Sequence, residues 1–420
     1  TTLKNAGFKK LIVTAKHHDG FCIWNSAYTD YDIASTSYKN GEGDILAEIS
    51  AACTAANMDM GLYLSPWDVA ESTFGSDGGS INNAYNEYYN NQLEEILSNP
   101  KYGNKGHFKE VWMDGAKGSG AGYQEYDFKK WFDTIQQYEG IAGNQVDDCM
   151  LFGAEAYTTV RWIGNENGFA AEETWSKSNV DKEKNTINSN SSGGYTKGFP
   201  DGNQWTVPEA DARITSGWFW GDSKKTPKTM EELSEMYFRS VGHNAPLLLN
   251  VPPNNKGKVD DAILRRVTEF GTAINKTFEK NLAKDAEVSA TEVRGKDTTY
   301  SPQNVLDGKD DTYWTVNDET KSGTLLIDLK KDTLFDVVSI EESIEFGQRI
   351  GKFKVEYQTA NGEWKKFDEG TTVGAKRLSR RSPVKSSKIR ITVTAHESAE
   401  NKIPMISEVG VYKAAAGMEA

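Results

Sequence analysis

Two carboxylates lie in sequence contexts that suit acid-base or nucleophilic chemistry. Asp114 ends the apolar run Glu110–Met113 and is followed by Gly115, where glycine lets the chain turn sharply. An N-cap role for this aspartate is the alternative, but the next helical pattern begins too far along the chain, near Tyr126. Glu166 lies between two asparagines in Arg161–Gly168, a segment with two glycines that we expect to be a loop. Glycoside hydrolysis needs one carboxylate as nucleophile or base and one carboxylic acid. Further candidates for the acid are Glu172, Glu173 and Glu209.

Two of the five histidines, His17 and His18, adjoin directly after an apolar run and precede Asp19. The remaining histidines are isolated along the chain, so a zinc site is not expected. Neutral imidazoles can donate hydrogen bonds to hydroxyl groups, and we expect these two to act as donors to the hydroxyl groups of a substrate. A pair of histidines satisfied by local hydrogen bonds is the alternative.

Tryptophans also follow the apolar runs, in Ser65-Pro66-Trp67-Asp68 and Gly217-Trp218-Phe219-Trp220. Core packing is the common explanation for tryptophan. The same rings can stack on the apolar face of a sugar, and Trp67 fits both interpretations.

The elements that position these residues alternate between short apolar runs and longer helical patterns, which predicts parallel βαβ units. The expected strands are 11–15, 61–64, 111–113, 150–153, 214–219 and 247–251, and the expected helices are 44–57, 83–97, 126–138, 230–241 and 260–280. A (β/α)8-type barrel fits best, with catalytic groups at the carboxyl ends of its strands. A doubly wound sheet is second, because no glycine-rich fingerprint follows any strand. Residues 1–8 resemble the end of a helix, so we expect the first barrel strands to be absent from this chain.

The pattern changes near residue 282, where short alternating segments replace the helices. Expected strands are 323–329, 334–340, 352–358, 388–393 and 406–411, and Asn361-Gly362 is a hairpin signal. We therefore predict a barrel domain over residues 1–281 and an all-β, discoidin-like sandwich over residues 282–420.

Composition narrows the class of protein. The chain has 420 residues, with 61 Asp and Glu against 48 Lys and Arg. This acidic balance argues against nucleic-acid binding, and no window approaches the roughly 20 apolar residues of a membrane span. The three cysteines, Cys22, Cys53 and Cys149, form no metal or disulfide pattern and are expected to be buried.

Several strings together resemble the family 29 α-L-fucosidases, most closely the subgroup that removes α-1,3/1,4-linked fucose from branched, Lewis-type glycans. These strings are Ala15–Phe21, Gly61–Asp68, Val111–Gly115, Val160–Trp162 with Gly164–Glu166, Gly217–Phe219 and Leu247–Pro253. In the second domain, Phe346–Ile350 and Gly374–Arg377 resemble the discoidin-like module of that subgroup.

The resemblance implies a retaining exo-fucosidase without a catalytic cofactor. Asp114 would be the nucleophile that forms a covalent fucosyl-enzyme, and Glu166 the acid/base. Retention requires these carboxyl groups to lie roughly 5–5.5 Å apart. Asp68 is expected to contact the branching galactose or glucosamine. The full set of expected substrate-binding residues is His17, His18, Tyr63, Trp67, Asp68, Arg161, Trp162 and Trp218. The implied partners are fucosylated oligosaccharides or glycoconjugates, met outside a bacterial cell or on its surface.

Two departures from the family accompany the resemblance. An early segment with a further fucose-binding histidine and a glutamate is not in this chain. Gly221 and Lys224-Lys225 replace the usual residues after Gly-Trp-Phe, which predicts a different leaving-group preference.

The second domain contains an aspartate-rich turn over Leu306–Trp314. It resembles the discoidin-type loop that holds a structural calcium, with Asp307, Asp310 and Thr312 as the expected ligands. An aspartate-rich turn without metal is the alternative.

Two other functions stay open at this point. A catalytically inactive protein that binds fucosylated glycans would keep the same pocket residues. Another barrel glycosidase, such as a galactosidase, would keep the two carboxylates.

Overall fold

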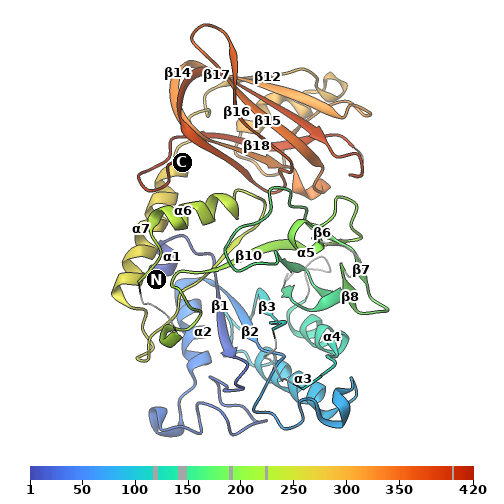
Figure 1. Cartoon of the computed structure of the whole chain (residues 1–420), viewed down its shortest axis with the longest axis vertical. Coiled ribbons are helices and arrows are strands. Elements are labelled where there is room, and N and C mark those ends of the chain that lie inside the picture. Colours follow the sequence, from blue (N-terminus) through green and yellow to red (C-terminus); the bar gives the residue numbers. More distant parts are fainter. Residues whose placement is uncertain (117–121, 141–148, 189–192, 223–225, 400–401) are drawn as a thin grey trace. The chain divides into compact units, whose positions relative to one another are not determined.

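The computed structural model describes residues 1–116, 122–140, 149–188, 193–222, 226–399 and 402–420. Its residues separate into two compact units (Figure 1). The first unit comprises residues 1, 7–161 and 180–187, and the second comprises residues 2–6, 162–179 and 188–420. We describe each unit by itself.

The first unit is built on parallel strands joined by helices. Strand β1 pairs with β2, β2 with β3, β3 with β4 and β4 with β5, all in parallel. Their bounds are β1 Lys10–Lys16, β2 Asp59–Leu64, β3 Glu110–Trp112, β4 Met150–Phe152 and β5 Val160–Trp162. A small antiparallel hairpin joins β7 (Val180–Asp181) to β8 (Thr186–Ile187). Parallel pairing brings the carboxyl ends of the strands to one edge, where the predicted site residues follow them.

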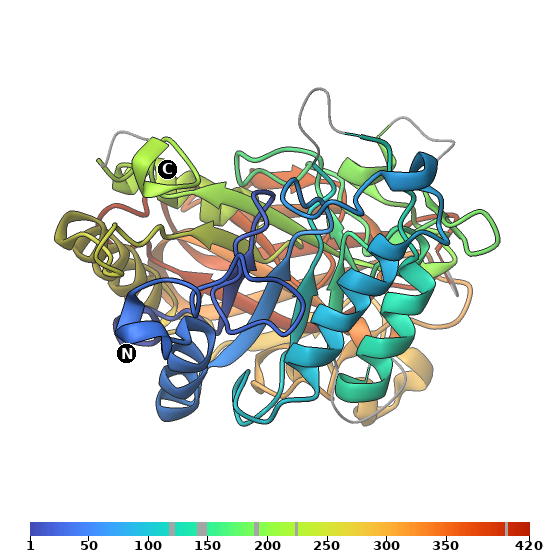
Figure 2. The ribbon, with the colours of Figure 1, turned by 90° about the horizontal axis from the view of Figure 1, so that it is seen from below.

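Each long helix of the first unit begins at a polar cap. The bounds are α2 Ile45–Ala56, α3 Ala84–Leu97 and α4 Phe128–Glu139, with short 3-10 turns at Tyr38–Gly41, Ser76–Gly79 and Glu155–Tyr157. Asp44, Asn83 and Asp127 accept hydrogen bonds from backbone N–H groups of the first turns, which satisfies donors that the helix leaves unpaired. Helices α3 and α4 lie side by side in Figure 2, and Thr134 on α4 donates to Asn90 on α3.

The core of the first unit is rich in aromatic side chains. Trp24, Tyr85, Tyr89 and Trp131 are completely buried. All three cysteines are buried and free, as expected from the sequence. Burial raises the pKa of the Cys22 thiol to about 12, and it also raises the pKa values of Cys53 and Cys149.

The second unit combines further α/β elements with the C-terminal sandwich. Its α/β elements are α1 Thr2–Asn5, β6 Lys177–Ser178, α5 Gly194–Lys197, β9 Gln204–Trp205, β10 Val207–Arg213, a 3-10 turn at Trp220–Asp222, α6 Met230–Arg239, β11 Leu247–Asn250 and α7 Asp261–Phe278. Strands β10 and β11 are parallel, with Ala210 opposite Leu247. Helix α6 begins with a complete capping box between Thr229 and Glu232.

The C-terminal domain is all β except for short 3-10 turns. Its strands are β12 Glu287–Ala290, β13 Trp314–Thr315, β14 Ser322–Glu342, β15 Ile350–Gln358, β16 Trp364–Gly370, β17 Arg377–Ala395 and β18 Met405–Tyr412, and its 3-10 turns are Arg294–Lys296, Thr298–Tyr300, Pro302–Leu306 and Ile344–Phe346. The central strand β14 pairs antiparallel with β12, β17 and β18. Inward-facing Trp314, Phe335 and Ile391 contribute to a continuous buried core.

These elements confirm the predicted fold class. The α/β part has a curled parallel sheet of half-barrel type, and an all-β, discoidin-like domain follows it. The predicted helices and most strands are present. Among the described residues, no helix is long and apolar enough to span a membrane.

Three local predictions were wrong. The strand expected at 214–219 is instead β10, which ends at Arg213. Its buried acidic residues, Glu209 and Asp211, gave it no apolar run that would mark a strand. The segment from Arg161 was expected to be a loop, but β5 runs to Trp162. The two strands expected at 323–329 and 334–340 are one long strand, β14.

Candidate active site

Asp114 lies immediately beyond β3, and its side chain is 23% exposed. Its Oδ2 atom accepts a hydrogen bond from the Tyr63 hydroxyl over 2.8 Å, and its Oδ1 atom accepts one from the Ala116 N–H over 2.8 Å. Asp114 is not the N-cap of the following helix, because Asp127 caps α4. Burial and the neighbouring carboxylate raise the pKa of Tyr63, so its hydroxyl stays protonated as a donor. The carboxylate is therefore held in one orientation and remains accessible.

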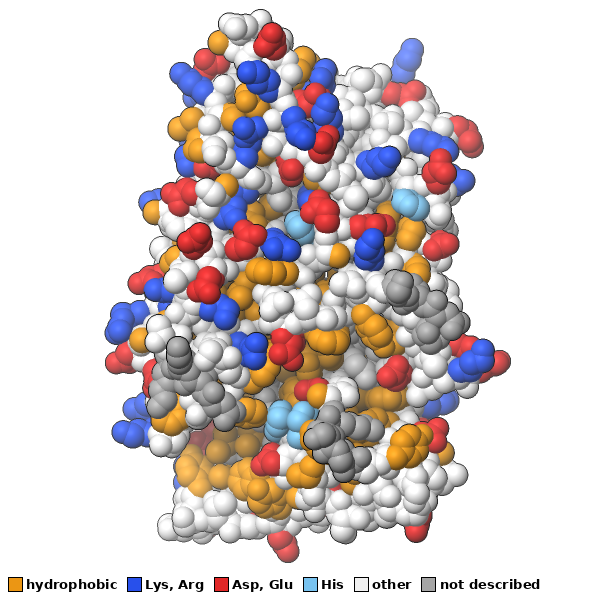
Figure 3. Space-filling view, in the orientation of Figure 1, with side chains coloured by type: hydrophobic (Ala, Val, Ile, Leu, Met, Phe, Trp, Pro, Cys, Tyr) orange, Lys and Arg blue, Asp and Glu red, His pale blue; other side chains and the backbone are white. Residues whose placement is uncertain are grey.

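The histidine pair lies beside this carboxylate. The His18 Nε2 atom is 3.7 Å from Asp114 Oδ2, and the ring centroids of His17 and His18 are 4.0 Å apart. Burial lowers the pKa of both imidazoles, and for His17 the adjacent His18 lowers it further. Both are therefore neutral near pH 7. Figure 3 shows histidine side chains, in pale blue, at the surface beside hydrophobic side chains.

The hydrogen bonds around His18 fix its tautomer. Its Nδ1 atom is 2.7 Å from Ser65 Oγ, and the Ser65 hydroxyl donates to the Trp67 carbonyl oxygen over 2.6 Å. Because the serine proton is used in that bond, His18 Nδ1–H must be the donor to Ser65. The neutral ring then presents Nε2 as an acceptor, so a substrate hydroxyl would donate to His18. The sequence had suggested the opposite direction.

Aromatic rings line the first-unit site in layers. The Tyr63 ring stacks on His17 at 5.7 Å and on Trp112 at 5.3 Å. The Trp67 ring lies 4.7 Å from the His18 ring and is half-buried. Trp67 and Tyr63 therefore lie next to the histidines and the carboxylate, and their contact with a sugar stays a prediction.

The expected sugar contact of Asp68 needs correction. Its side chain is 1% exposed, and Oδ2 forms a buried ion pair with Lys16 at 3.0 Å. The other oxygen, Oδ1, accepts the N–H groups of Ala70 and Glu71. Both oxygens are thus occupied below the surface. Lys16 also donates to Gln92, so Asp68 stabilises the end of β1 rather than facing a sugar.

Glu166 belongs to the second unit, where its side chain is 47% exposed. Trp218 Nε1 donates to Glu166 Oε2 over 3.2 Å, and Arg213 Nη1 is 3.8 Å from the same oxygen. The Arg213 guanidinium also lies over the Trp218 ring, and Asn250 at the end of β11 donates to the Trp218 carbonyl. The structure therefore brings together Glu166 and Trp218, two residues singled out from the sequence.

The rival carboxylates are engaged elsewhere. Glu172 pairs with Arg377. Glu173 accepts from Trp175 Nε1 and lies 3.4 Å from Lys197. Glu209 is 5% exposed on β10. Among these four glutamates, Glu166 is the one beside a tryptophan predicted to contact sugar.

Arg161 also needs correction as a substrate-binding residue. It is completely buried on β5, and this burial lowers the pKa of its guanidinium to about 10. A side chain without exposed surface cannot contact a sugar directly. The next residue, Trp162, is 38% exposed and donates through Nε1 to Asp211 over 2.9 Å, so its ring stays accessible.

Sequence reasoning missed Arg213 and Asp211 because it did not predict β10. A signal was present in the strand itself. Glu209, Asp211 and Arg213 alternate with Ala210 and Ala212, which are completely buried. Such alternation places the charged residues on one face of the strand. Lys224 and Lys225, which predicted a changed leaving-group preference, lie outside the described residues.

One group of side chains in the described part of the chain has the composition of a metal site. Donor atoms of His17, His18 and Asp114 lie within 4.8 Å of one another. Asp114 Oδ2 already accepts from Tyr63, and His18 Nδ1 is already engaged with Ser65. The same groups suit hydrogen bonds to a polyol.

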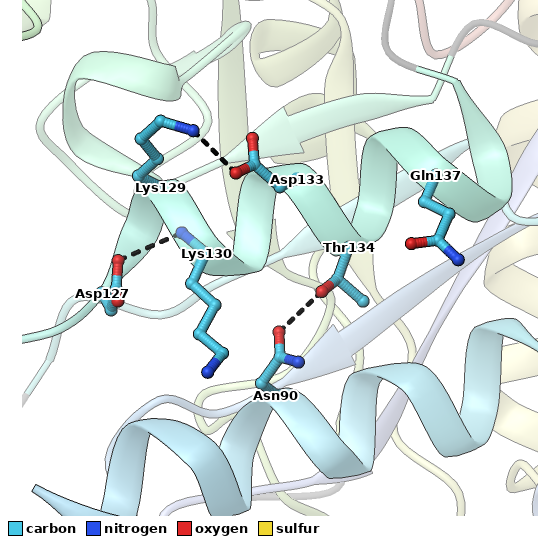
Figure 4. Close-up of a pocket in the computed structure, with 7 residues that line it drawn as sticks. All are labelled: Asn90, Asp127, Lys129, Lys130, Asp133, Thr134 and Gln137. Atoms are coloured by element: carbon cyan, nitrogen blue, oxygen red, sulfur yellow. Dashed lines mark hydrogen bonds and ion pairs between the residues drawn. The ribbon is translucent and has the colours of Figure 1, made fainter. Parts of the chain in front are cut away.

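A polar groove on the first unit has a different character. It is lined by residues of α3, α4 and the cap of α4, namely Asn90, Asp127, Lys129, Lys130, Asp133, Thr134 and Gln137 (Figure 4). The Lys129 and Asp133 side chains form an ion pair within it. Since none of the lining residues is aromatic, the groove lacks the stacking surface of a sugar site.

Comparison with known proteins gives the family. Residues 1–279 match the family model described as "Alpha-L-fucosidase", and residues 287–409 match the F5/8 type C domain. The chain is 39% identical over 412 residues to "Alpha-L-fucosidase 1" of Arabidopsis thaliana, covering 97% of this chain and 76% of that protein. The chain belongs to the family 29 α-L-fucosidases. The family resemblance seen in the sequence is thereby confirmed, and the chain is a glycoside hydrolase of α-L-fucosidase type.

Solved structures agree with this membership. A family 29 fucosidase of Ruminococcus gnavus, determined in complex with fucose, is 64% identical with a TM-score of 0.93, covering 100% of this chain and 85% of that one. A putative α-L-fucosidase from Bacteroides thetaiotaomicron is 32% identical with a TM-score of 0.84, covering 99% and 87%. These comparisons do not favour an inactive glycan-binding protein.

Proposed function

We propose that this fucosidase is a retaining exo-enzyme that removes α-1,3/1,4-linked fucose from branched, Lewis-type glycans. One observation carries the proposal. Asp114, a partly exposed carboxylate just beyond the end of β3, is oriented by Tyr63 and the Ala116 N–H and lies beside the neutral His18. A carboxylate held in one orientation beside hydroxyl-binding groups suits attack on a sugar.

The proposed reaction has two steps. In the first, an Asp114 carboxylate oxygen forms a bond to the anomeric carbon of fucose, and the bond from that carbon to the leaving-group oxygen breaks. Glu166 gives its proton to the departing oxygen. In the second, Glu166 takes a proton from water, whose oxygen bonds to the anomeric carbon and releases Asp114. Two inversions give α-L-fucose as the first product.

Recognition of fucose would depend on the two histidines. Their neutral state suits hydrogen bonds to hydroxyl groups, with His18 Nε2 accepting. The solved structure of the Ruminococcus gnavus relative is a complex with fucose, which supports the same substrate here. Trp67 would pack on the sugar beside His18.

The leaving-group side would involve Trp162 and Trp218. Trp218 contacts Glu166 directly, so its ring lies where the proposed acid/base meets the departing sugar. The linkage preference rests on the resemblance to the α-1,3/1,4 subgroup. A panel of α-1,2-, α-1,3-, α-1,4- and α-1,6-linked fucosides would test it, and preferential release from the α-1,2 substrate would contradict it.

We also propose a structural calcium in the F5/8 type C domain. Asp307 and Thr312 contact each other through Thr312 Oγ1. Burial, and the nearby carboxylates of Glu341, Asp307 and Asp310, raise the pKa of Glu408 to about 7. Carboxylate and hydroxyl oxygens are the ligands that calcium takes. Asp307, Asp310 and Thr312 would hold the ion with Glu408, and calcium would neutralise their charge.

We also propose that the protein is exported from the cell. The family resemblance suggests a bacterial enzyme that acts outside the cell or at its surface, where fucosylated glycans are met. Fractionation of the source cells, followed by activity assays of medium, membrane and cytoplasm, would test this location. Activity confined to the cytoplasm would contradict it.

The decisive experiment is proton NMR of the protein with a Lewis-type trisaccharide, recording which fucose anomer appears first. Initial α-L-fucose would support retention, and initial β-L-fucose would overturn the two-step reaction. Asp114→Asn and Glu166→Gln variants, assayed on the same substrate, test the two assigned roles. An Asp114→Asn enzyme with full activity would refute the nucleophile.

A further inference from the structure

Two sequence motifs of the C-terminal domain are not explained by the proposed catalytic residues. They are Phe346–Ile350 and Gly374–Arg377. In the second unit, side chains from and beside these motifs contact the segment from Glu172 to Ser176, which follows the Glu166 loop. We call these side chains the clamp; they are Asn244, Gln348, Thr371, Thr372 and Arg377.

Gln348 forms hydrogen bonds with backbone groups on both sides of Trp175 in the segment Glu172–Ser176, which we call the held segment. Its Oε1 atom accepts the Ser176 N–H over 2.7 Å, and its Nε2 atom donates to the Thr174 carbonyl over 2.8 Å. The Thr372 hydroxyl oxygen accepts the Thr174 N–H over 2.9 Å. Gln348 and Thr372 are 3% and 2% exposed. Buried bonds of this kind hold a segment that has little regular structure of its own.

Arg377 holds the start of the segment. Its Nη1 atom donates to the Glu172 carbonyl over 3.0 Å, its Nη2 atom pairs with the Glu172 carboxylate, and Thr371 Oγ1 donates to the same carbonyl over 2.8 Å. The Arg377 side chain is almost fully buried. The backbone at Gly370 approaches closely as well, because a Cβ there would lie 2.6 Å from Glu172 Oε1.

Asn244 lies in the turn after α6 and forms hydrogen bonds both with the held segment and with other residues of the clamp. Its Nδ2 atom contacts the Thr174 carbonyl, Ser176 Oγ and Gln348 Oε1, and its Oδ1 atom accepts the Ala375 N–H over 2.7 Å. The turn adopts the left-handed region at Asn244, with φ of 64°. A Cβ at Gly374 would lie 2.2 Å from Asn244 Cγ, so the two turns fit only with glycine there.

The held segment begins six residues after Glu166 (172 − 166). Between them, the Gly168 N–H donates to the Asp211 carbonyl and the Ala170 N–H donates to the Arg239 carbonyl. The loop is thus fixed at successive points by β10, by the end of α6 and then by the clamp. A shift of residues 172–176 would be transmitted to Glu166 through a short, tightly bonded stretch.

We propose that the F5/8 type C domain takes part in catalysis by fixing the loop that carries Glu166, with Arg377, Thr372, Gln348 and Asn244 as positioning residues. This inference rests on the acid/base role proposed for Glu166. It predicts that loosening the clamp harms proton donation to the leaving group more than it harms attack by the nucleophile. The domain would then serve the reaction without contacting the substrate.

The test compares kcat/KM for two fucosides with different leaving groups. The dinitrophenolate leaving group of a dinitrophenyl fucoside departs without help from an acid. The sugar leaving group of a natural fucoside must be protonated at its oxygen as it departs. For Arg377→Gln we expect kcat/KM to fall about tenfold for the sugar-linked substrate and less than about twofold for the dinitrophenyl fucoside. The control, Arg390→Gln, breaks a comparable ion pair to Glu356 within the sandwich and should leave both values unchanged.

A second, milder variant tests the same inference in case Arg377→Gln does not fold. Thr372→Val removes one hydrogen bond to Thr174 at constant volume, and we expect the same pattern with a smaller effect. Equal losses for both substrates, or no loss in folded variants, would overturn the inference. The Glu166→Gln enzyme is assayed in parallel. If that enzyme shows no leaving-group dependence, the acid/base assignment fails; if it does and the clamp variants do not, only the positioning role fails.

Discussion

The Tyr63 hydroxyl donates to Asp114 Oδ2 over 2.8 Å, and the two residues come from the ends of neighbouring strands, β2 and β3. The parallel register places Tyr63 opposite Trp112, two residues before Asp114. A residue on one strand thus fixes the carboxylate that follows the next. The sequence alone indicates each residue but not the bond between them.

Replacing Tyr63 with phenylalanine should lower kcat/KM by about 10- to 100-fold, because a hydrogen bond to a charged group contributes about 1.5–3 kcal/mol. The measurement is steady-state hydrolysis of an aryl fucoside. Tyr38→Phe is the matched control, since Tyr38 donates to the Glu48 carboxylate over 3.2 Å on an exposed part of the first unit. A Tyr63→Phe enzyme with unchanged kinetics would contradict the orienting role.

Asp68→Asn should destabilise the protein and leave KM almost unchanged. It removes the partner of the buried Lys16 ammonium, and breaking a buried pair costs about 3–5 kcal/mol. Urea denaturation measures the loss. Asp133→Asn breaks an ion pair whose side chains are 65% and 57% exposed, and should change the free energy of unfolding by less than about 0.5 kcal/mol. A large rise in KM with unchanged stability would restore the sugar contact.

His243 should make the protein sensitive to acid. Burial lowers its pKa to about 4; Arg377 and Arg239 lower it too, while Glu172 opposes them. The unfolded chain, with the ordinary pKa of 6.5, therefore binds a proton that the native state does not, and stability falls as pH falls from 6.5 towards 4. In His243→Gln, the slope of unfolding free energy against pH should decrease by up to about 1.4 kcal/mol per pH unit. Identical slopes from denaturation at several pH values would count against this.

Calcium should raise the melting temperature, because an ion that binds only the folded state stabilises it by about 2.7 kcal/mol at 100 times its dissociation constant. Thermal melts with and without CaCl2 measure the effect, and MgCl2 at equal ionic strength is the control. Glu408→Gln and Asp307→Asn should abolish the calcium response. A shift that persists in both variants would show that calcium binds elsewhere.

The sequence predicts those parts of the fold that are encoded locally. Continuous apolar runs mark β1 and β2, and polar caps such as Asp44 and Asn83 mark where helices begin. The site residues at strand ends could be found for the same reason. Strand β10 was missed because its buried Glu209 and Asp211 resemble a solvated segment, and its alternation with alanines is a weaker signal than an apolar run.

The burial of individual polar residues could not be predicted from the sequence either. Asp68 and Arg161 have the side chains of substrate-binding residues, and only the packing around them shows that they are buried. The clamp is a stronger example, since Arg377 and Glu172 are 205 positions apart. Contacts at such separation depend on the whole fold and leave no local pattern.

The positions of the three cysteines have a practical consequence. Cys22, Cys53 and Cys149 all belong to the first unit and are at most 3% exposed, whereas the second unit has no thiol in its sequence. Since the reactive species is the thiolate, burial that raises a thiol pKa suppresses modification twice over, by blocking access and by preventing ionisation. The rate at which a thiol reagent labels the native enzyme therefore measures how often the first unit opens, without a contribution from the second unit. Intact mass spectra taken during mild heating would show whether that unit opens before the rest of the protein melts.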